Sequence, residues 1–309
     1  MKTILTLLLV LITLNLSAQE VQIIVDTCTI KGTLELPQTD QPVTAVLIIA
    51  GSGPTDRNGN NRLAGENNAY KMLADLLLQN GIASLRYDKR GIGESCEVNE
   101  AGLTFETYIN DAVEWINFLK NDERISNVII IGHSEGSLIG MAAAQKTDVS
   151  KFISLCGAGR PIDQILEEQV ITNGKLPEPY IEPFKSSLDS LKQGHLVNKV
   201  DPAFMALFRP SVQPYLISWL KYNPVEEISK LNIPVLVVGG TTDIQVAVKD
   251  AELLAAANPD AGLAIIENMN HILKNVPSTD RAENFKSYSN PDLPLSDNLC
   301  EVLLKFIKE

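Results

Sequence analysis

The segment Val128-Ile129-Ile130-Ile131-Gly132-His133-Ser134-Glu135-Gly136 joins a continuous apolar run to a stretch rich in Gly and Ala that extends to residue 145. Consecutive β-branched residues favour a buried strand, and the Ala-rich stretch favours a helix that packs closely on a sheet. The G-x-S-x-G pattern between them predicts a sharp strand-to-helix turn that exposes the Ser134 hydroxyl at the sheet edge. Such a turn leaves no room for side chains at positions 132 and 136. Ser134 is therefore the candidate nucleophile.

The same alternation of apolar strands and amphipathic helices continues on both sides of this turn. Helices are expected over residues 105–120, 134–145 and 299–307, with apolar positions at helical spacing in the first. The pattern predicts an α/β protein with a mostly parallel central sheet and helices on both faces, led by one antiparallel pair. The expected strands are residues 21–25, 29–36, 43–50, 82–87, 128–131, 152–155, 235–238 and 264–266.

One long stretch interrupts the alternation. Residues 160–231 carry no strand signal, several prolines and many helix-forming residues, which predicts a helical cap inserted between two parts of the core, residues 19–159 and 232–309. Apolar residues at helical spacing usually pack against a core, but a cap over the nucleophile must also line a pocket. The cap residues expected to form an apolar acyl pocket are Phe204, Phe208, Tyr215 and Trp219.

A serine hydroxyl needs a base to take its proton, and the chain has three histidines. His133 adjoins Ser134 and is expected to be structural, and His195 lies in the cap, where a surface position is expected. His271 follows the last expected strand at the edge where Ser134 emerges, so it is the candidate base. Asp243, at the carboxyl end of the strand over residues 235–238, is the candidate acid that orients it, with Asp250 as its nearest competitor.

The charge that develops on the substrate carbonyl oxygen requires two backbone N–H donors. One is expected from Glu135, the residue after the nucleophile. The other is expected from the Gly-rich loop after the strand over residues 43–50, at Ser52 or, as a second choice, Gly53.

The N-terminus and the overall charge restrict location and partners. Residues 1–18 combine Lys2, a short apolar run and a small residue at Ala18, which predicts a signal peptide and an exported, periplasmic or secreted protein; an uncleaved anchor is the alternative. The net charge of −12 argues against nucleic acid and anionic membrane surfaces as partners. The four cysteines show no metal-binding spacing, and their pairing stays open, as does the oligomeric state.

Several segments resemble bacterial α/β-hydrolase carboxylesterases, within the serine aminopeptidase (S33) and monoacylglycerol lipase-like grouping. The similar segments are residues 51–60 as the oxyanion loop, 87–95 as a D-x-R-G-x-G-x-S motif, 132–136 as the nucleophile elbow and 240–246 as the acid loop. The resemblance implies the α/β-hydrolase fold and ester hydrolysis through an acyl-enzyme, without a metal or organic cofactor. One departure is Ala50, where many relatives have His at the start of the oxyanion loop.

The resemblance also includes charged residues that lie outside the expected catalytic triad. Asp88, Arg90 and Ser95 are expected to form a charged pair and a turn that fix a loop beside the site. Asp56 and Arg57 are expected to form an ion pair within their own loop, and contact with a polar substrate is the alternative.

The expected activity is hydrolysis of short- to medium-chain carboxylic esters, a small-molecule substrate class. Two alternatives stay open. A serine aminopeptidase would use the same triad and would need a cap carboxylate, such as Glu167 or Glu168, to hold a free amine. A non-catalytic binding protein could use the same scaffold.

Overall fold

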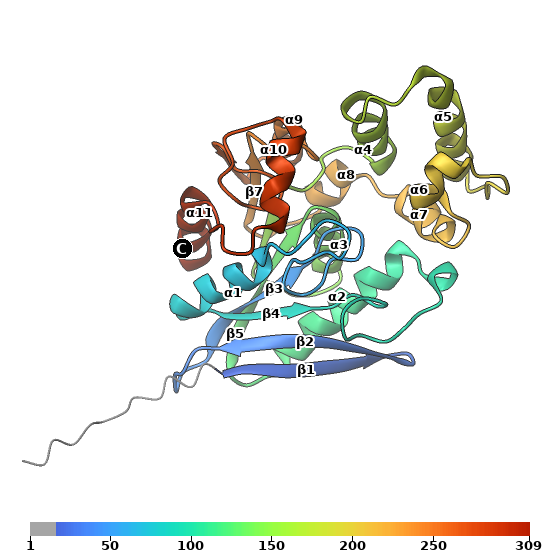
Figure 1. The fold of residues 1–309 in the computed structure, drawn as a ribbon. Coiled ribbons are helices and arrows are strands. Elements are labelled where there is room, and N and C mark those ends of the chain that lie inside the picture. Colours follow the sequence, from blue (N-terminus) through green and yellow to red (C-terminus); the bar gives the residue numbers. More distant parts are fainter. Residues whose placement is uncertain (1–16) are drawn as a thin grey trace, which may run out of the picture.

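The computed structural model describes residues 17–309, and the expected signal segment therefore lies almost entirely outside the described residues. An eight-stranded sheet in the order β1-β2-β4-β3-β5-β6-β7-β8 forms the centre of the molecule (Figure 1). β1, β2 and β4 pair antiparallel, and every other neighbouring pair is parallel. The strands are β1 Ser17–Val25, β2 Cys28–Leu36, β3 Val43–Ile49, β4 Ala83–Tyr87, β5 Ile125–His133, β6 Lys151–Leu155, β7 Val235–Gly240 and β8 Gly262–Ile266.

Alternate side chains of the parallel strands enter two separate cores, one on each face of the sheet. On one face, Leu47 and Ile130 pack with α2 (Phe105–Lys120), α3 (Glu135–Ala144) and α9 (Val248–Ala257), around the buried Trp115. On the other face, Val46 and Ile131 pack with α1 (Ala69–Gln79) and α11 (Asp297–Lys308). Because helices cover both faces of the sheet, the parallel strands are continuously apolar. The predicted α/β fold with a mostly parallel sheet is confirmed.

The helices follow the strands in the expected alternation, and α2 occupies the range that was predicted for it. In the core they are α1 Ala69–Gln79, α2 Phe105–Lys120, α3 Glu135–Ala144, α9 Val248–Ala257, α10 Arg281–Lys286 and α11 Asp297–Lys308. Between β6 and β7 they are α4 Ile162–Glu167, α5 Glu178–Lys192, α6 Met205–Phe208, α7 Gln213–Trp219 and α8 Pro224–Ser229.

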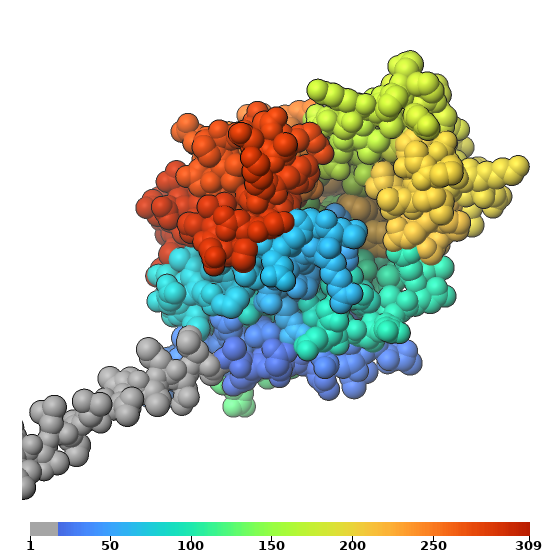
Figure 2. All heavy atoms as spheres, viewed as in Figure 1, coloured from blue at the N-terminus to red at the C-terminus, as the bar shows by residue number. Residues whose placement is uncertain are grey.

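The segment between β6 and β7 has its own apolar core, which includes Phe184, Phe204 and Phe208. Helices α4 to α7 stand beside the carboxyl ends of the strands, as a lobe next to the C-terminal part of the chain (Figure 2). α8 instead packs with α3 and α9 on the central sheet's side. None of the described helices is long and apolar enough to cross a membrane.

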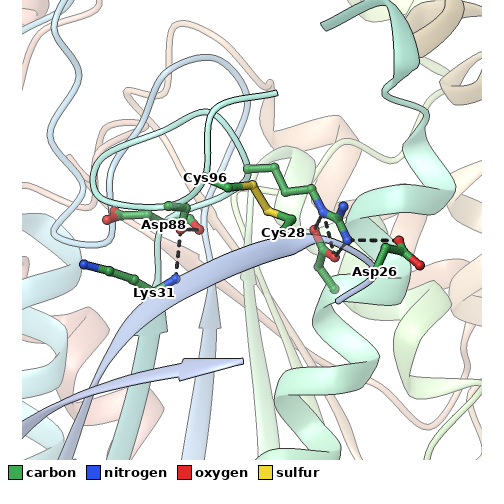
Figure 3. The surroundings of a disulfide bond; sticks show 8 residues. Asp26, Cys28, Lys31, Asp88 and Cys96 are labelled. Atoms are coloured by element: carbon green, nitrogen blue, oxygen red, sulfur yellow. Dashed lines mark hydrogen bonds and ion pairs between the residues drawn. A yellow bond between two sulfur atoms is a disulfide. The ribbon is translucent and has the colours of Figure 1, made fainter. Parts of the chain in front are cut away.

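A disulfide that the sequence left open connects the antiparallel edge to the loop after β4. Cys28 begins β2, Cys96 lies in that loop, and their Cα atoms are 5.5 Å apart (Figure 3). Cys156 and Cys300 are free thiols. The bond holds the loop over residues 88–96 against the edge of the sheet, close to the carboxyl ends of β3 and β5.

Candidate active site

Ser134 lies between β5 and α3 in a conformation that few side chains adopt. Its φ is 54° and its ψ is −120°, and its backbone N–H donates to the carbonyl of Leu155 at 2.9 Å. A Cβ at Gly132 would lie 2.3 Å from the carbonyl oxygen of Gly136, and one at Gly136 would lie 2.3 Å from that of Ile49. The flanking glycines are thus required by close backbone approach, as the sequence predicted, and the strained turn presents Ser134 at the sheet edge.

His271 and Asp243 meet at the same edge, although they are 28 positions apart in the sequence. His271 Nδ1 lies 2.7 Å from Asp243 Oδ2, and both side chains are buried. The other carboxylate oxygen of Asp243 accepts the backbone N–H groups of Gln245 and Val246 at 2.8 and 2.9 Å. The carboxylate is therefore fixed by three donors and aimed at the imidazole. Ser134 and His271 line one cavity.

The competing acid, Asp250, lies elsewhere. Its carboxylate binds the Arg160 guanidinium at 2.7 Å and accepts the backbone N–H of Gly159. His195 is exposed in the cap segment. The structure thus brings Ser134, Asp243 and His271 together and leaves the competing Asp250 and His195 apart from them.

The loop after β3 packs directly against the elbow. A Cβ at Gly51 would lie 3.1 Å from the Ser134 Cβ, and Ser52 lines the same cavity as Ser134. The backbone N–H of Ser52 has no acceptor among the described residues. The N–H of Glu135, the first residue of α3, has none within its helix, as is usual at a helix N-terminus. Within the part of the chain that the structure describes, neither predicted oxyanion donor has an acceptor, and both lie beside the nucleophile.

The charged residues around this loop pair differently from the prediction. Arg57 does not pair with Asp56 but binds Asp88 at 2.9 Å, and Asp56 accepts backbone N–H groups of its own turn. Arg90 does not pair with Asp88 but binds Asp111 at 2.6 Å. Both expected pairs were wrong because partners from other segments lie closer in space than the neighbours in sequence.

A hydrogen-bonded chain connects the oxyanion loop to His271 behind the elbow. The Gly51 N–H donates to the Tyr70 hydroxyl at 3.1 Å, and that hydroxyl lies 2.7 Å from His133 Nδ1. His133 Nε2 lies 2.7 Å from the backbone carbonyl of His271, which can only accept, so Nε2 carries the proton and Nδ1 accepts from Tyr70. Burial lowers the pKa of His133 to about 3, which keeps this ring neutral.

A buried ion pair lies on the other side of the elbow. Lys89 Nζ donates to the Gly51 carbonyl at 2.6 Å and lies 3.1 Å from the Glu135 carboxylate. The second oxygen of that carboxylate accepts the Tyr215 hydroxyl, from α7, at 2.6 Å. These side chains connect both predicted oxyanion segments to the cap. Sequence reasoning missed Lys89 and Tyr70 in these roles. Lys89 stands between Asp88 and Arg90, and Tyr70 adjoins Lys71, so no local pattern distinguished either residue from its polar neighbours.

The cavity at Ser134 has a volume of about 360 Å³. Apolar groups make up the larger part of its wall, with polar groups set among them. Among the described residues, the wall comes from the oxyanion loop, the start of α1, the elbow, the acid loop, the segment after His271 and one residue of the cap segment, Gln169. The lining side chains beyond the elbow include Asn61, Asn67, Gln169, Gln245, Arg281, Phe285 and Tyr288.

None of the four cap aromatics predicted to line the pocket is found on this wall. Phe204 and Phe208 are buried in the core of the cap, with ring centroids 5.3 Å from that of Phe184. Trp219 stacks on Phe105 of α2 at 5.5 Å, and Tyr215 binds Glu135. Their helical spacing reflects packing of the cap on itself and on α2, so the assignment of these four residues to the pocket was wrong. The apolar part of the wall comes instead from residues outside the cap, among them Ile244, Ile272 and Leu273.

His133, Cys156 and His271 form the one cluster of metal-ligand types found among residues 17–309, with their ligand atoms within 4.8 Å of one another. Both nitrogens of His133 are engaged by Tyr70 and the His271 carbonyl, and Nδ1 of His271 is engaged by Asp243. Burial raises the pKa of the Cys156 thiol, and the neighbouring Asp243 carboxylate raises it further. The cluster is thus the hydrogen-bonded support of the site rather than a set of open ligands.

The comparisons with known proteins agree with this geometry. Residues 60–182 match the family described as serine aminopeptidase, S33. The chain is 25% identical to esterase EstD of Thermotoga maritima over 279 residues, which cover 89% of this chain and 65% of that protein. The chain thus spans just under two thirds of the length of this relative.

Two solved structures share the whole fold at low identity. Est1E from Butyrivibrio proteoclasticus, with ferulic acid bound, has a TM-score of 0.61 at 17% identity, covering 94% of this chain and 100% of that chain. The alpha/beta hydrolase GrgF from Penicillium has a TM-score of 0.62 at 17% identity, covering 94% and 97%. The resemblance inferred from the motifs is confirmed, and the fold is that of the α/β-hydrolases.

Proposed function

We propose that this α/β-hydrolase, a relative of the serine aminopeptidase (S33) family and of bacterial esterases, hydrolyses carboxylic esters through an acyl-enzyme on Ser134. The observation that carries the proposal is the arrangement at the sheet edge. Ser134 on its strained turn shares one cavity with His271, and His271 is held by Asp243 at 2.7 Å. A nucleophile, a base and an acid in this order support acyl transfer.

In the proposed mechanism, His271 Nδ1–H donates to Asp243, which leaves the lone pair of Nε2 for the Ser134 proton. The Ser134 oxygen attacks the ester carbonyl carbon, and the carbonyl oxygen becomes an oxyanion that accepts from the N–H groups of Ser52 and Glu135. Collapse of this intermediate breaks the bond to the alcohol oxygen, which takes the proton from His271. Water, deprotonated by His271, then attacks the acyl carbon and releases the carboxylic acid and free Ser134.

The test is covalent labelling combined with turnover. Wild-type protein should react with a fluorophosphonate probe and release p-nitrophenol from acetate through octanoate esters. Ser134→Ala should lose both signals, and heat-denatured wild-type protein is the control for non-specific labelling. A folded wild-type protein that neither labels nor releases p-nitrophenol would overturn the proposal in favour of a binding protein.

Nothing around the cavity favours the aminopeptidase alternative. The Glu168 carboxylate binds Arg160 and, at 2.9 Å, Lys249, so its charge is already matched. Glu167 is not among the residues that line the cavity. Without an acidic partner for a free amine, we expect alanine and proline anilides to be hydrolysed far more slowly than esters.

We also propose that the protein is exported and that residues 1–18 are removed. The N-terminal sequence pattern and the Cys28–Cys96 disulfide support an oxidising compartment. Ser17 and Ala18 are the first two residues of β1 and pair with Leu36 and Glu35, so cleavage after Ala18 would leave most of the strand in place. Mass spectrometry of the protein from cell fractions would test this, with a mature N-terminus at Gln19 expected.

A further inference from the structure

The wall of the Ser134 cavity carries a charge opposite to that of the protein. Acidic residues outnumber basic ones by 38 to 26 in the chain, yet no Asp or Glu is among the described residues that line the cavity. Apart from the histidines, Arg281 is the one cationic side chain that residues 17–309 contribute to that wall. Its guanidinium therefore dominates the local field in a site that is otherwise lined by neutral amides, hydroxyls and apolar groups.

The exposed side chain of Arg281 contacts an aromatic ring and is not neutralised by any residue of the described chain. Arg281 is the first residue of α10, and its guanidinium carbon lies 5.3 Å from the centroid of the Phe285 ring, which also lines the cavity. No ion pair or hydrogen bond joins the Arg281 side chain to another residue of the described chain. A stacked guanidinium with free N–H groups is the arrangement that suits bidentate binding of a carboxylate.

Tyr288 supplies a second donor from the same segment. Its side chain is buried, and burial raises the pKa of its phenol, so the hydroxyl keeps its proton. The hydroxyl accepts from Gln245 Nε2 at 2.9 Å, while its own proton has no acceptor among residues 17–309. The backbone N–H of Gln245 in turn donates to Asp243. Gln245 thus joins Tyr288 to the loop of the triad acid.

We propose that the preferred substrates are esters that also carry a carboxylate, which Arg281 binds with the Tyr288 hydroxyl as a second donor. The inference rests on the proposed ester hydrolysis and specifies its substrate class. Arg281 and Tyr288 are specificity-determining residues here and take no part in the bond-breaking steps. The carboxylate could belong to the acyl group or to the alcohol, and matched substrate pairs distinguish these two cases.

The experiment compares charged and neutral esters of nearly equal size by pH-stat titration at low salt. Monomethyl succinate against methyl butanoate tests a carboxylate on the acyl side. 4-Acetoxybenzoate against 4-acetoxybenzamide tests one on the alcohol side. In at least one pair, wild-type kcat/KM should favour the carboxylate about tenfold or more, which corresponds to a charge-assisted pair at a partly exposed site. The preference should shrink at high salt.

Substitutions test which residues cause the preference for carboxylate-bearing esters. Arg281→Gln should abolish the preference by lowering kcat/KM for the carboxylate ester far more than for its neutral partner. Arg281→Lys should keep part of the preference, and Tyr288→Phe should reduce it. Lys286→Gln is the matched control, because Lys286 is an exposed cation of the same helix that does not line the cavity. A reduction with Lys286→Gln equal to that with Arg281→Gln would overturn the assignment to Arg281.

The possible results distinguish a failure of the carboxylate preference from a failure of the proposed ester hydrolysis. Equal turnover of both members of each pair by wild-type protein would overturn the carboxylate preference and leave ester hydrolysis intact. Absence of turnover for all four esters, together with absence of fluorophosphonate labelling, would overturn both. Calorimetry with Ser134→Ala gives a second readout: 4-hydroxybenzoate should bind about tenfold tighter than 4-hydroxybenzamide, and equal affinity would contradict an alcohol-side carboxylate site.

Discussion

At the scale of single residues, the proposed chemistry depends on the hydrogen bond between His271 and Asp243. Asp243→Asn should keep the fold but favour the wrong tautomer of His271, because an amide can donate to Nδ1. We expect kcat/KM to fall by about 10⁴-fold, and by a similar factor in His271→Ala. Steady-state kinetics with p-nitrophenyl acetate measure this.

The control for this prediction is Asp250→Asn. Asp250 is buried and binds Arg160, so the substitution should lower the melting temperature without a comparable loss of kcat/KM. A loss of activity in Asp250→Asn as large as that in Asp243→Asn would contradict the assignment of the triad acid.

His133 provides a prediction on pH dependence. Its pKa is about 3 in the folded protein against an ordinary value of 6.5, because burial disfavours the charged ring. Between these values the unfolded chain holds a proton that the folded chain lacks, so the free energy of unfolding rises with pH across this window. The stabilisation is complete above about pH 6.5 and is lost as pH falls, by up to about 1.4 kcal/mol per pH unit.

Urea unfolding between pH 4.5 and 7.5 tests this prediction when His133→Gln is measured beside wild type. The glutamine cannot titrate, so the difference in unfolding free energy between the two proteins should shrink as pH falls. A difference that stays constant over this range would show that His133 titrates alike in both states.

At the scale of elements, Lys89, Glu135 and Tyr215 hold the end of β4, the start of α3 and the cap helix α7 together. Lys89→Met should leave the Glu135 carboxylate buried without its cation, which costs about 3–5 kcal/mol of unfolding free energy. Lys89→Met/Glu135→Gln should cost less, since no uncompensated charge remains. Urea unfolding measures both, and additive losses in the double variant would mean that the pair is not coupled.

The hydroxyl of Tyr215 connects the cap to the residue whose N–H is a proposed oxyanion donor. Tyr215→Phe removes one hydrogen bond, worth about 1 kcal/mol, and should lower kcat about fivefold with little change in KM, because Tyr215 does not line the cavity. The matched control is Tyr222→Phe, whose hydroxyl makes only a 3.4 Å contact with Glu106. A change confined to KM would contradict a positioning role.

At the scale of the whole molecule, the Cys28–Cys96 disulfide closes a long loop, because the two cysteines are 68 positions apart in the sequence. Restricting the unfolded chain in this way contributes about 4 kcal/mol on the loop-entropy estimate. Cys28→Ser/Cys96→Ser should therefore lose most of that stability in urea unfolding. Cys300→Ser removes a free, half-buried thiol and should have a small effect, and an equal loss in both variants would argue against a structural disulfide.

Much of this architecture could be predicted because its signals are local. β3, β6 and β8 were found within one or two residues, since each is a short apolar run. β5 is longer than predicted: it begins at Ile125 and includes the exposed polar residues Ser126 and Asn127, which pairing with β3 retains in the strand. α10 was not predicted, because six residues in a polar stretch give no periodic pattern.

The sequence by itself determined the alternation of strands and helices, the glycine-flanked turn at Ser134 and the order of Ser134, Asp243 and His271. These features depend on local backbone preference and on the rule that parallel strands end at one edge of the sheet. Only the tertiary structure decided which side chains from distant segments meet: Tyr70 with His133, Lys89 with Glu135, and Arg281 with the cavity wall. Such contacts depend on how loops and the cap pack over the sheet, and hydrophobic periodicity carries no information on that packing. For the same reason the cap aromatics, whose spacing indicates burial but not the surface they bury against, were assigned to the wrong place.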